Sequence, residues 1–161
     1  MSWQQTLASA ADTEALGARL AQHCPWDERA ARALHLHGEL GSGKTTLTRG
    51  LLRALGESGS IVSPSYSLIE LYRLGPGTVV HVDLYRLNSV AEFEALGLAD
   101  YYQGRTLLLI EWPERAAARL PPPDLALALQ FEGEGRRCTA VDATEAGRRW
   151  LARLGTGEGL S

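Results

Sequence analysis

Residues 38–45, Gly38-Glu39-Leu40-Gly41-Ser42-Gly43-Lys44-Thr45, match the phosphate-loop pattern GxxxxGK[ST] in full. The apolar stretch 33–37 before them predicts a strand, and the leucines after them predict a helix with one apolar face. In this order of strand, loop and helix, the glycines let backbone N–H groups face phosphate oxygens, and the helix adds its positive N-terminal end. The stretch therefore predicts a site for the phosphates of a nucleoside triphosphate, and the alternative is a chance glycine turn.

Two side chains of this loop carry the expected chemistry. Lys44 is predicted to bridge the β- and γ-phosphates, and the Thr45 hydroxyl to ligate Mg²⁺. Thr46 completes the predicted ATP-binding stretch. Lys44 is also the only lysine among the 16 lysines and arginines of the chain. A chain so poor in lysine thus has one where a phosphate loop needs it.

Two acidic residues end predicted strands further along the chain. Asp83 ends the strand 78–83, and Glu111 follows the apolar run 107–110, which is typical of a strand buried on both faces. Ligands of open α/β sheets lie beyond the carboxyl ends of the strands, so both acids are expected beside the phosphate loop. We therefore predict Lys44, Asp83 and Glu111 as the catalytic residues. One acid would hold the metal and the other position the attacking water, and the sequence leaves this division of roles open.

A polar loop, a tryptophan and three histidines complete the candidates. The polar loop at residues 63–66 resembles a nucleotide-sensing segment, and the alternative is a hydrophilic connector. Trp112 either stacks on a base or packs in the core. The histidines lie in predicted strands and are interpreted as structural. The loop residues are Ser63, Pro64, Ser65 and Tyr66, and the histidines are His35, His37 and His81.

The order of the elements predicts an α/β fold of the P-loop NTPase kind. Its sheet is expected to be mostly parallel, to end in a C-terminal antiparallel hairpin and to be flanked by helices. A first helix carries Leu16 and Leu20, with Asp12 or Thr13 as its N-cap, and Ser89 opens a later helix. The remaining elements are a strand from Leu68 to Tyr72, hairpin strands 125–131 and 137–141, and a helix around 144–154.

Length and composition limit the class of protein. At 161 residues the chain fits one domain, 1–154, followed by a short flexible tail, 155–161. A net charge of −3 argues against a surface that grips nucleic acid unaided, so no DNA partner and only indirect contact with RNA are expected. Two distant cysteines, no signal-peptide pattern and no apolar run of bilayer length favour a cytoplasmic protein with no membrane partner.

Four blocks of sequence together resemble one family. GELGSGKTT, SPSYSL, HVDLYRL and EWPER, in this order and spacing, resemble the bacterial tRNA threonylcarbamoyladenosine biosynthesis ATPase family TsaE, also called YjeE. The likeness runs from about residue 5 to residue 153. A phosphate loop alone is shared by many families, whereas the four blocks in combination are specific.

This resemblance implies a Mg²⁺-dependent, slow and partner-stimulated ATPase. The family acts with a TsaB-TsaD complex in making N6-threonylcarbamoyladenosine at tRNA position 37, so the tRNA is met only through the complex. By resemblance, Thr45 and Glu111 coordinate Mg²⁺, Asp83 is needed for hydrolysis, and SPSYSL is a switch loop in which Ser65 replaces the usual threonine. Trp112 is implied to lie near the nucleotide. The resemblance also implies that Ala10, Gly135 and Arg136 approach the adenine side of the nucleotide.

Three other functions are alternatives to this one. A small-molecule kinase uses the same loop, and Arg115 and Arg119 flank a possible short lid, but the stretch 120–123 that follows leaves little room for an acceptor pocket. A GTPase needs an Asn-Lys-x-Asp element, whereas Asn88, the only asparagine, is followed by serine. A non-hydrolysing, nucleotide-dependent adapter differs from the ATPase only in degree. Whether Arg86 or Arg115 serves the transition state is left open.

Overall fold

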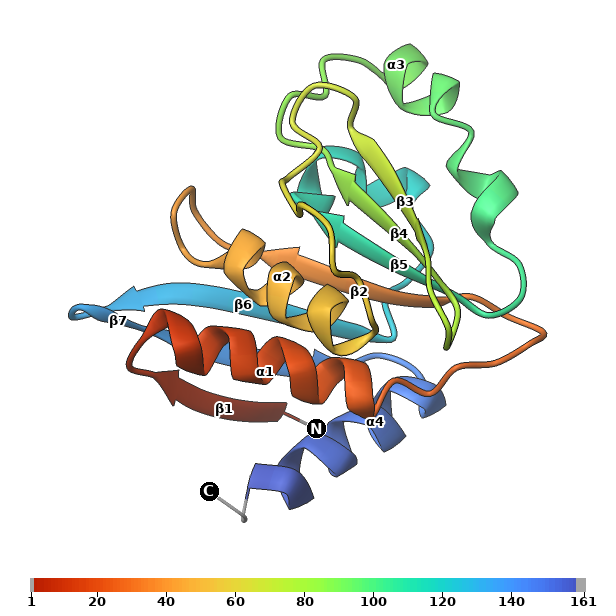
Figure 1. Cartoon of the computed structure of the whole chain (residues 1–161). Coiled ribbons are helices and arrows are strands. Elements are labelled where there is room, and N and C mark those ends of the chain that lie inside the picture. The colour runs from red at the N-terminus through yellow and green to blue at the C-terminus, as the bar shows by residue number, and fades with distance from the viewer. Residues whose placement is uncertain (1, 159–161) are drawn as a thin grey trace.

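The computed structural model describes residues 2–158, which form one seven-stranded sheet (Figure 1). Strands β6, β2, β5 and β4 run parallel in its centre, with β7 and β1 antiparallel at one edge and β3 antiparallel at the other. The predicted α/β fold with a C-terminal antiparallel hairpin is confirmed. The strands are β1 (Ser2–Leu7), β2 (Arg32–His37), β3 (Ile69–Arg73), β4 (Thr78–Asp83), β5 (Thr106–Glu111), β6 (Leu125–Glu132) and β7 (Gly135–Asp142).

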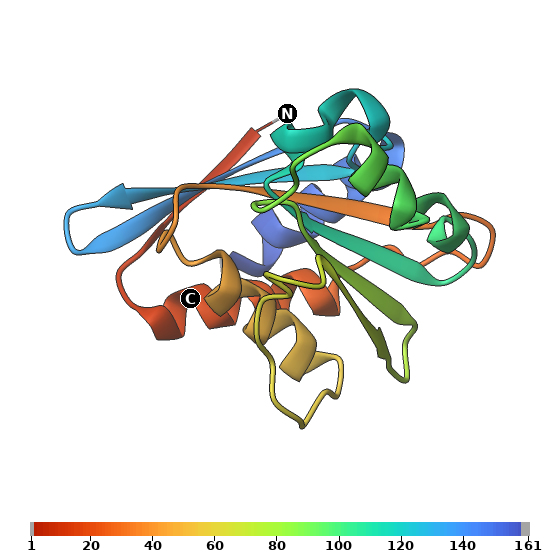
Figure 2. The same ribbon diagram turned by 90° about the horizontal axis from the view of Figure 1, so that it is seen from above.

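Helices cover both faces of the sheet (Figure 2). One face packs against α1 (Ala10–Gln22), α2 (Lys44–Ala54) and α4 (Glu145–Glu158). The other packs against α3 (Val90–Ala95) and the 3₁₀ helices η1 (Leu98–Tyr101) and η2 (Pro113–Arg119). The central strands are therefore buried on both sides, which explains the apolar run of β5. Within residues 2–158, no helix is both long enough and apolar enough to span a bilayer.

The N-terminal strand β1 was missed by the sequence analysis. It pairs antiparallel with β7, placing Trp3 opposite Ala140 at the edge of the sheet. Its residues alternate between exposed and half-buried, and only Leu7 is fully buried. An edge strand with this polar composition lacks the apolar alternation by which strands are recognised.

Several predicted boundaries were wrong, among them those of the hairpin, whose strands β6 and β7 run beyond the predicted 125–131 and 137–141. The N-cap of α1 is Ser9, whose Oγ accepts from Asp12 N at 3.2 Å, and the Asp12 carboxylate accepts from Ala8 N at 3.0 Å. The pair resembles a capping box, except that the carboxylate accepts from the N–H of the residue before the N-cap, and Asp12 therefore lies inside the helix rather than at its cap. β3 is shifted one residue later than predicted, to Ile69–Arg73. Helix α4 continues through Glu158 into the predicted tail, of which residues 159–161 lie outside the described residues.

Two glycines allow α1 and α2 to touch. A Cβ added at Gly17 would lie 2.1 Å from the carbonyl oxygen of Leu47, and one at Gly50 would lie 2.1 Å from that of Glu14. Both distances are far below van der Waals contact, so only glycine permits this crossing. The contact fixes α1 against the helix that follows the phosphate loop.

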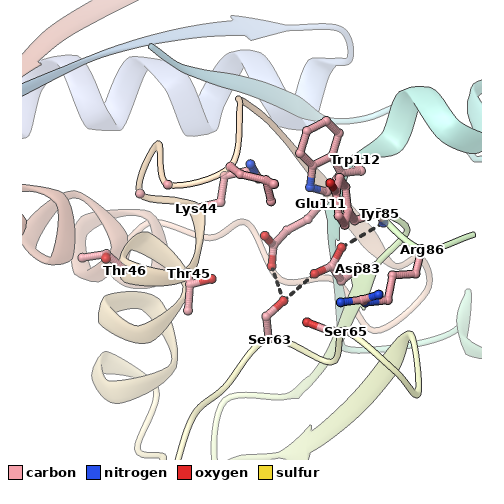
Figure 3. Close-up of a pocket in the computed structure, with 13 residues that line it drawn as sticks. Lys44, Thr45, Thr46, Ser63, Ser65, Asp83, Tyr85, Arg86, Glu111 and Trp112 are labelled. Atoms are coloured by element: carbon pink, nitrogen blue, oxygen red, sulfur yellow. Dashed lines mark hydrogen bonds between the residues drawn. The ribbon is translucent and has the colours of Figure 1, made fainter. Parts of the chain in front are cut away.

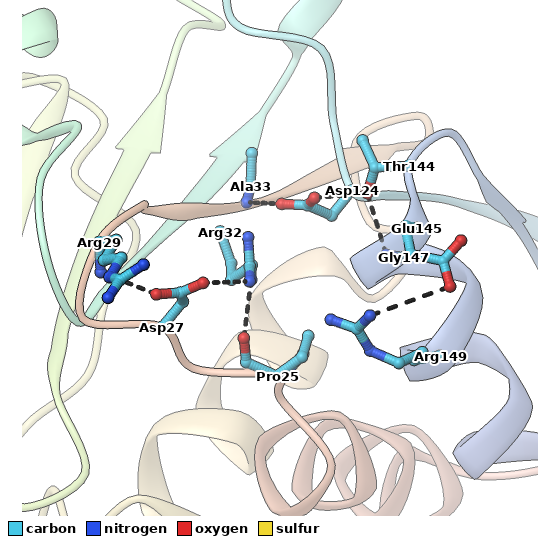
Figure 4. Close-up of polar contacts among 10 residues, drawn as sticks. All are labelled: Pro25, Asp27, Arg29, Arg32, Ala33, Asp124, Thr144, Glu145, Gly147 and Arg149. Atoms are coloured by element: carbon cyan, nitrogen blue, oxygen red, sulfur yellow. Dashed lines mark hydrogen bonds and ion pairs between the residues drawn. The ribbon is translucent and has the colours of Figure 1, made fainter.

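A buried aspartate anchors the opposite end of the central strands (Figure 4). Asp124 accepts hydrogen bonds from Ala33 N at 2.7 Å and from the Thr144 hydroxyl at 2.6 Å. The same hydroxyl accepts from Gly147 N at 3.0 Å, which ties in the first turn of α4. The Asp124 carboxylate thus joins the start of β2, the start of β6 and α4. It therefore fixes the position of β2, the strand that leads into the phosphate loop.

His35 on β2 makes folding sensitive to acid. Its side chain is buried, its Nε2 has no hydrogen-bond partner within residues 2–158, and burial lowers its pKa from 6.5 to about 4. The unfolded chain therefore binds a proton as the pH falls below 6.5, while the folded chain stays neutral until about pH 4. This linkage destabilises the fold by about 2 kcal/mol between pH 7 and pH 5.

We expect His35→Leu to lose that part of the acid sensitivity. Urea unfolding of both proteins at the two pH values measures the difference. The free energy of unfolding of the variant is expected to fall by about 2 kcal/mol less than that of the wild type. Equal falls in the two proteins would show that His35 is not held neutral.

Candidate functional site

A cavity of about 410 Å³ lies where the phosphate loop meets the carboxyl ends of β4 and β5 (Figure 3). The structure thus brings together the segments that the sequence analysis singled out. The residues that line this cavity come from the phosphate loop, from residues 63–66 (the serine loop), from the turn after β4 and from the end of β5. They are Leu40, Gly41, Gly43, Lys44, Thr45, Thr46, Ser63, Ser65, Asp83, Tyr85, Arg86, Glu111 and Trp112.

The loop backbone has the left-handed geometry that glycine permits. Gly41 and Gly43 have φ angles of 78° and 109°. At Gly38, with φ 150°, an added Cβ would lie 2.4 Å from the Ser42 hydroxyl. Helix α2 begins at Lys44, within this motif, and the N–H groups of its first turn have no partners within the helix. The arrangement is a cradle of backbone donors suited to an anion.

Lys44 is buried beneath this cradle. Its Nζ donates hydrogen bonds to Gly38 O and, at 3.1 Å, to Glu39 O, and it lies 4.6 Å from the centroid of the Trp112 ring. Burial lowers the pKa of the ammonium group, and the carboxylate of Glu111 opposes this effect. An anion placed in the cavity would favour the charged form further.

The two acids are neighbours joined by a serine. Asp83 and Glu111 occupy the same register on the parallel strands β4 and β5. The Ser63 hydroxyl donates to Asp83 Oδ2 at 2.5 Å and lies 3.5 Å from Glu111 Oε2 (Figure 3). Asp83 Oδ1 accepts from Tyr85 N at 3.0 Å. The serine loop is therefore connected directly to both predicted catalytic acids.

His81 contacts the site, a role that the sequence analysis did not assign. It is fully buried, and its Nε2 lies 2.6 Å from Glu111 Oε2. The signal that could have revealed it is its spacing, because a residue two positions before Asp83 lies on the same face of β4. The histidine fixes one oxygen of Glu111, and within residues 2–158 the other, Oε1, has no hydrogen-bond partner.

Trp112 closes one side of the cavity. It is one of two non-glycine residues with positive φ within the described chain, at 57°. Its ring lies against Lys44 and, with centroids 4.9 Å apart, against Tyr85, and it also packs on the core beneath α3. Backbone strain of this kind tends to occur at functional sites. Trp112 therefore packs on the core, as one of the two alternatives predicted, and its stacking on a base stays a prediction for a residue that borders the cavity.

A second cavity of about 150 Å³ adjoins the first and shares Gly41, Gly43 and Thr46 with it. It lies between the start of α1 and the start of β7, so it contains all three residues implied for the adenine side: Ala10, Gly135 and Arg136. The Arg136 guanidinium donates to Ser42 O at 3.1 Å and to Gly41 O at 3.0 Å. It therefore also braces the carbonyl groups of the phosphate loop.

Some predicted site residues line neither cavity. Glu39 is exposed on the outer side of the loop, and Ser42 is buried within it. Tyr66 is 86% exposed and lies under the guanidinium of Arg86 rather than facing the cavity. Gly38 and Pro64 shape the backbone of their loops without bordering either space.

The protein-family model described as "Threonylcarbamoyl adenosine biosynthesis protein TsaE" matches residues 7–139. The chain belongs to the TsaE family. This confirms the resemblance found in the four sequence blocks. The match covers the phosphate loop, the serine loop and both acids, and it ends within β7.

Relatives named "tRNA threonylcarbamoyladenosine biosynthesis protein TsaE" agree with this membership. The Haemophilus influenzae TsaE is 37% identical over 119 residues, which cover 74% of this chain and 75% of the relative. The Bacillus subtilis TsaE is 34% identical over 117 residues, which cover 73% and 72% of the two chains. The fold is also similar to the crystal structure of B. subtilis YdiB, with a TM-score of 0.79 and 22% identity over 98% of this chain and 97% of the other.

The donor atoms of the first cavity suit a magnesium ion that is held jointly with phosphate groups. Within residues 2–158, no three His, Cys, Asp or Glu side chains gather into a ready-made metal site. Mg²⁺ commonly uses one or two carboxylates together with water and substrate phosphates. Thr45 and Glu111 line the same cavity, and Glu111 Oε1 is available, so this donor set suits that mode.

Proposed function

We propose that this TsaE family member binds ATP with Mg²⁺ and hydrolyses it slowly, acting with a TsaB-TsaD-type complex in tRNA threonylcarbamoyladenosine biosynthesis. The observation that carries this proposal is the single cavity shared by Lys44, Thr45, Ser63, Asp83 and Glu111. The names of its relatives support the pathway. The net charge of −3 favours contact with tRNA through the complex rather than directly.

The binding roles follow from the positions of the side chains. Backbone N–H groups of the loop and the Lys44 ammonium group would hold the phosphates. Thr45 and Glu111 would hold Mg²⁺, which when bound neutralises charge on the β- and γ-phosphates. His81 keeps the Glu111 carboxylate in one orientation. The second cavity would then receive the adenosine end, beside Ala10 and Gly135.

Asp83 is suited to position the attacking water. Its two oxygens are directed by Ser63 Oγ and Tyr85 N, and it borders the cavity beside Arg86. A fixed carboxylate can orient water and accept a proton from it. We assign Glu111 to the metal and Asp83 to the water because only Glu111 is braced by a buried histidine.

The serine loop would report the state of the nucleotide. Ser63 is hydrogen-bonded to Asp83 and lies near Glu111. A ligand that binds to either carboxylate would therefore change the contacts that hold residues 63–66 in place. Loops that change order with the terminal phosphate are a common switching device. In this proposal ATP orders the loop for docking on the partner complex, and hydrolysis releases it.

Asp83→Asn tests the proposed hydrolysis. We expect turnover of ATP in the presence of the TsaB and TsaD proteins to fall about tenfold or more, because an amide accepts a proton poorly. Affinity for ATP is expected to stay within about twofold, since the phosphates are held by the loop. Phosphate release and isothermal titration calorimetry measure the two quantities.

Asp100→Asn, an exposed site in η1, is the matched control and should behave as wild type. Wild-type turnover in Asp83→Asn would contradict the role of Asp83. A wild-type protein that binds no ATP, or that transfers the phosphoryl group to a small acceptor, would contradict the proposed function. In the last case the kinase alternative would take its place.

A further inference from the structure

Arg86 is projected into the first cavity by a pinned turn. Tyr85 N donates to Asp83 Oδ1 at 3.0 Å, and Leu87 N donates to Leu84 O at 3.0 Å, so the turn that carries Arg86 is fixed from both sides. Figure 3 shows the guanidinium beside Asp83 and Ser65, directed towards the space in front of Thr45. The backbone thus presents an arginine to the predicted phosphate site.

The guanidinium of Arg86 is restrained and still has free hydrogen-bond donors. It lies 4.7 Å from the ring centroid of Tyr66, which belongs to the serine loop. Within residues 2–158 it forms no ion pair with a carboxylate. Stacking on a ring occupies the face of a guanidinium, whereas its N–H groups point outward in the plane. Those donors are therefore available to an anion in the cavity.

Arg115, the other arginine considered from the sequence, lies elsewhere. Its guanidinium is 5.5 Å from the Tyr85 ring and 5.9 Å from the Trp112 ring. It lines a separate cavity of about 540 Å³ between α3 and η2. The aromatic pair thus separates Arg115 from the first cavity, and the structure distinguishes the two arginines.

The position of Arg86 also indicates which end of a bound nucleotide it would contact. The second cavity, proposed for the adenosine end, meets the first at Gly41, Gly43 and Thr46, and Arg86 does not line it. Arg86 lies instead with Ser63 and Asp83. A phosphate chain that runs away from the adenosine end would meet Arg86 with its last phosphate.

We propose that Arg86 contacts the terminal phosphate of the bound nucleoside triphosphate and that its stacking on Tyr66 links this contact to the serine loop. The inference rests on the proposed ATP binding. The positive charge of Arg86 also helps to balance the charge of the complex, because Lys44 shares the cavity with two carboxylates and a triphosphate adds several more negative charges. An arginine can meet phosphate oxygens with two parallel hydrogen bonds.

Calorimetric titration of the full chain with ATP and with ADP, both with Mg²⁺, tests the proposal. Arg86→Gln is expected to weaken ATP binding about tenfold, the loss typical of a charge-assisted hydrogen bond, and to change ADP binding less than about twofold. Arg86→Lys should recover part of the ATP affinity because it keeps the charge. Arg115→Gln, a control that is also exposed and also stacked on aromatic rings, should leave both affinities within about twofold.

The outcomes separate the two proposals. If the wild type binds ATP and Arg86→Gln weakens ATP and ADP equally, or weakens neither, the contact with the terminal phosphate is wrong while nucleotide binding stands. A selective loss of ATP binding in Arg115→Gln would overturn the assignment in favour of that arginine. A wild-type chain that binds neither nucleotide would overturn the proposed function and this inference with it.

Discussion

Replacing Lys44 by alanine is expected to weaken ATP binding by at least about a hundredfold, or ~2.7 kcal/mol. Lys44 is buried and is the only lysine of the chain, and within residues 2–158 the other positive side chain that lines this cavity, Arg86, comes from the turn after β4 and not from the loop. The change removes charge-assisted hydrogen bonds to the phosphates and leaves the carboxylates of Asp83 and Glu111 facing them. Isothermal titration calorimetry with ATP and Mg²⁺ measures the loss.

Arg49→Ala provides a control on the same helix. Arg49 lies further along α2 and pairs with Glu14 at 3.7 Å, away from the cavity. Its removal takes the same charge from the chain and is expected to change ATP affinity less than about twofold, as for other exposed ion pairs. If Lys44→Ala kept the affinity of wild type while remaining folded, residues 38–45 would not be a nucleotide phosphate loop.

Replacing Gly50 by alanine is expected to destabilise the fold by about 3 kcal/mol or more. The added Cβ would lie 2.1 Å from Glu14 O and 2.7 Å from both Glu14 C and Cα, all backbone atoms of α1. A flexible side chain could move aside at small cost, but a helix backbone can do so only by separating α1 from α2. Urea unfolding followed by circular dichroism measures the free energy of unfolding.

Gly75→Ala is the matched control for this change. An added Cβ at Gly75 meets no atom within 4 Å, so we expect a change of about 0.5 kcal/mol or less. A Gly50→Ala protein as stable as the wild type would mean that the two helices are not held at this distance. Gly50→Ala also tests the second cavity, because separating α1 from α2 would move Ala10, the first residue of α1, which lines that cavity.

Local patterns were sufficient to predict which segments of the chain meet at the first cavity. The phosphate loop is contiguous in the sequence, and its strand and helix neighbours are marked by their own periodicity. Asp83 and Glu111 each end an apolar strand, and parallel strands bring their carboxyl ends to one edge. The contacts of His81 were missed because its spacing from Asp83 indicates only a shared face of β4 and does not distinguish packing from support of the Glu111 carboxylate.

The sequence by itself determined the phosphate loop, the strands that end in acids, the α/β class and the family, because each depends on residues close together in the chain or on their order. Only the tertiary structure decided which distant residues contact the phosphate loop and the two acids. Arg136 reaches the carbonyl of Gly41 because β7 lies at one side of the sheet, and Arg86 rather than Arg115 borders the first cavity because an aromatic pair lies between. Such contacts depend on strand order and on the face each side chain takes, and both are fixed only when the sheet and its helices pack together.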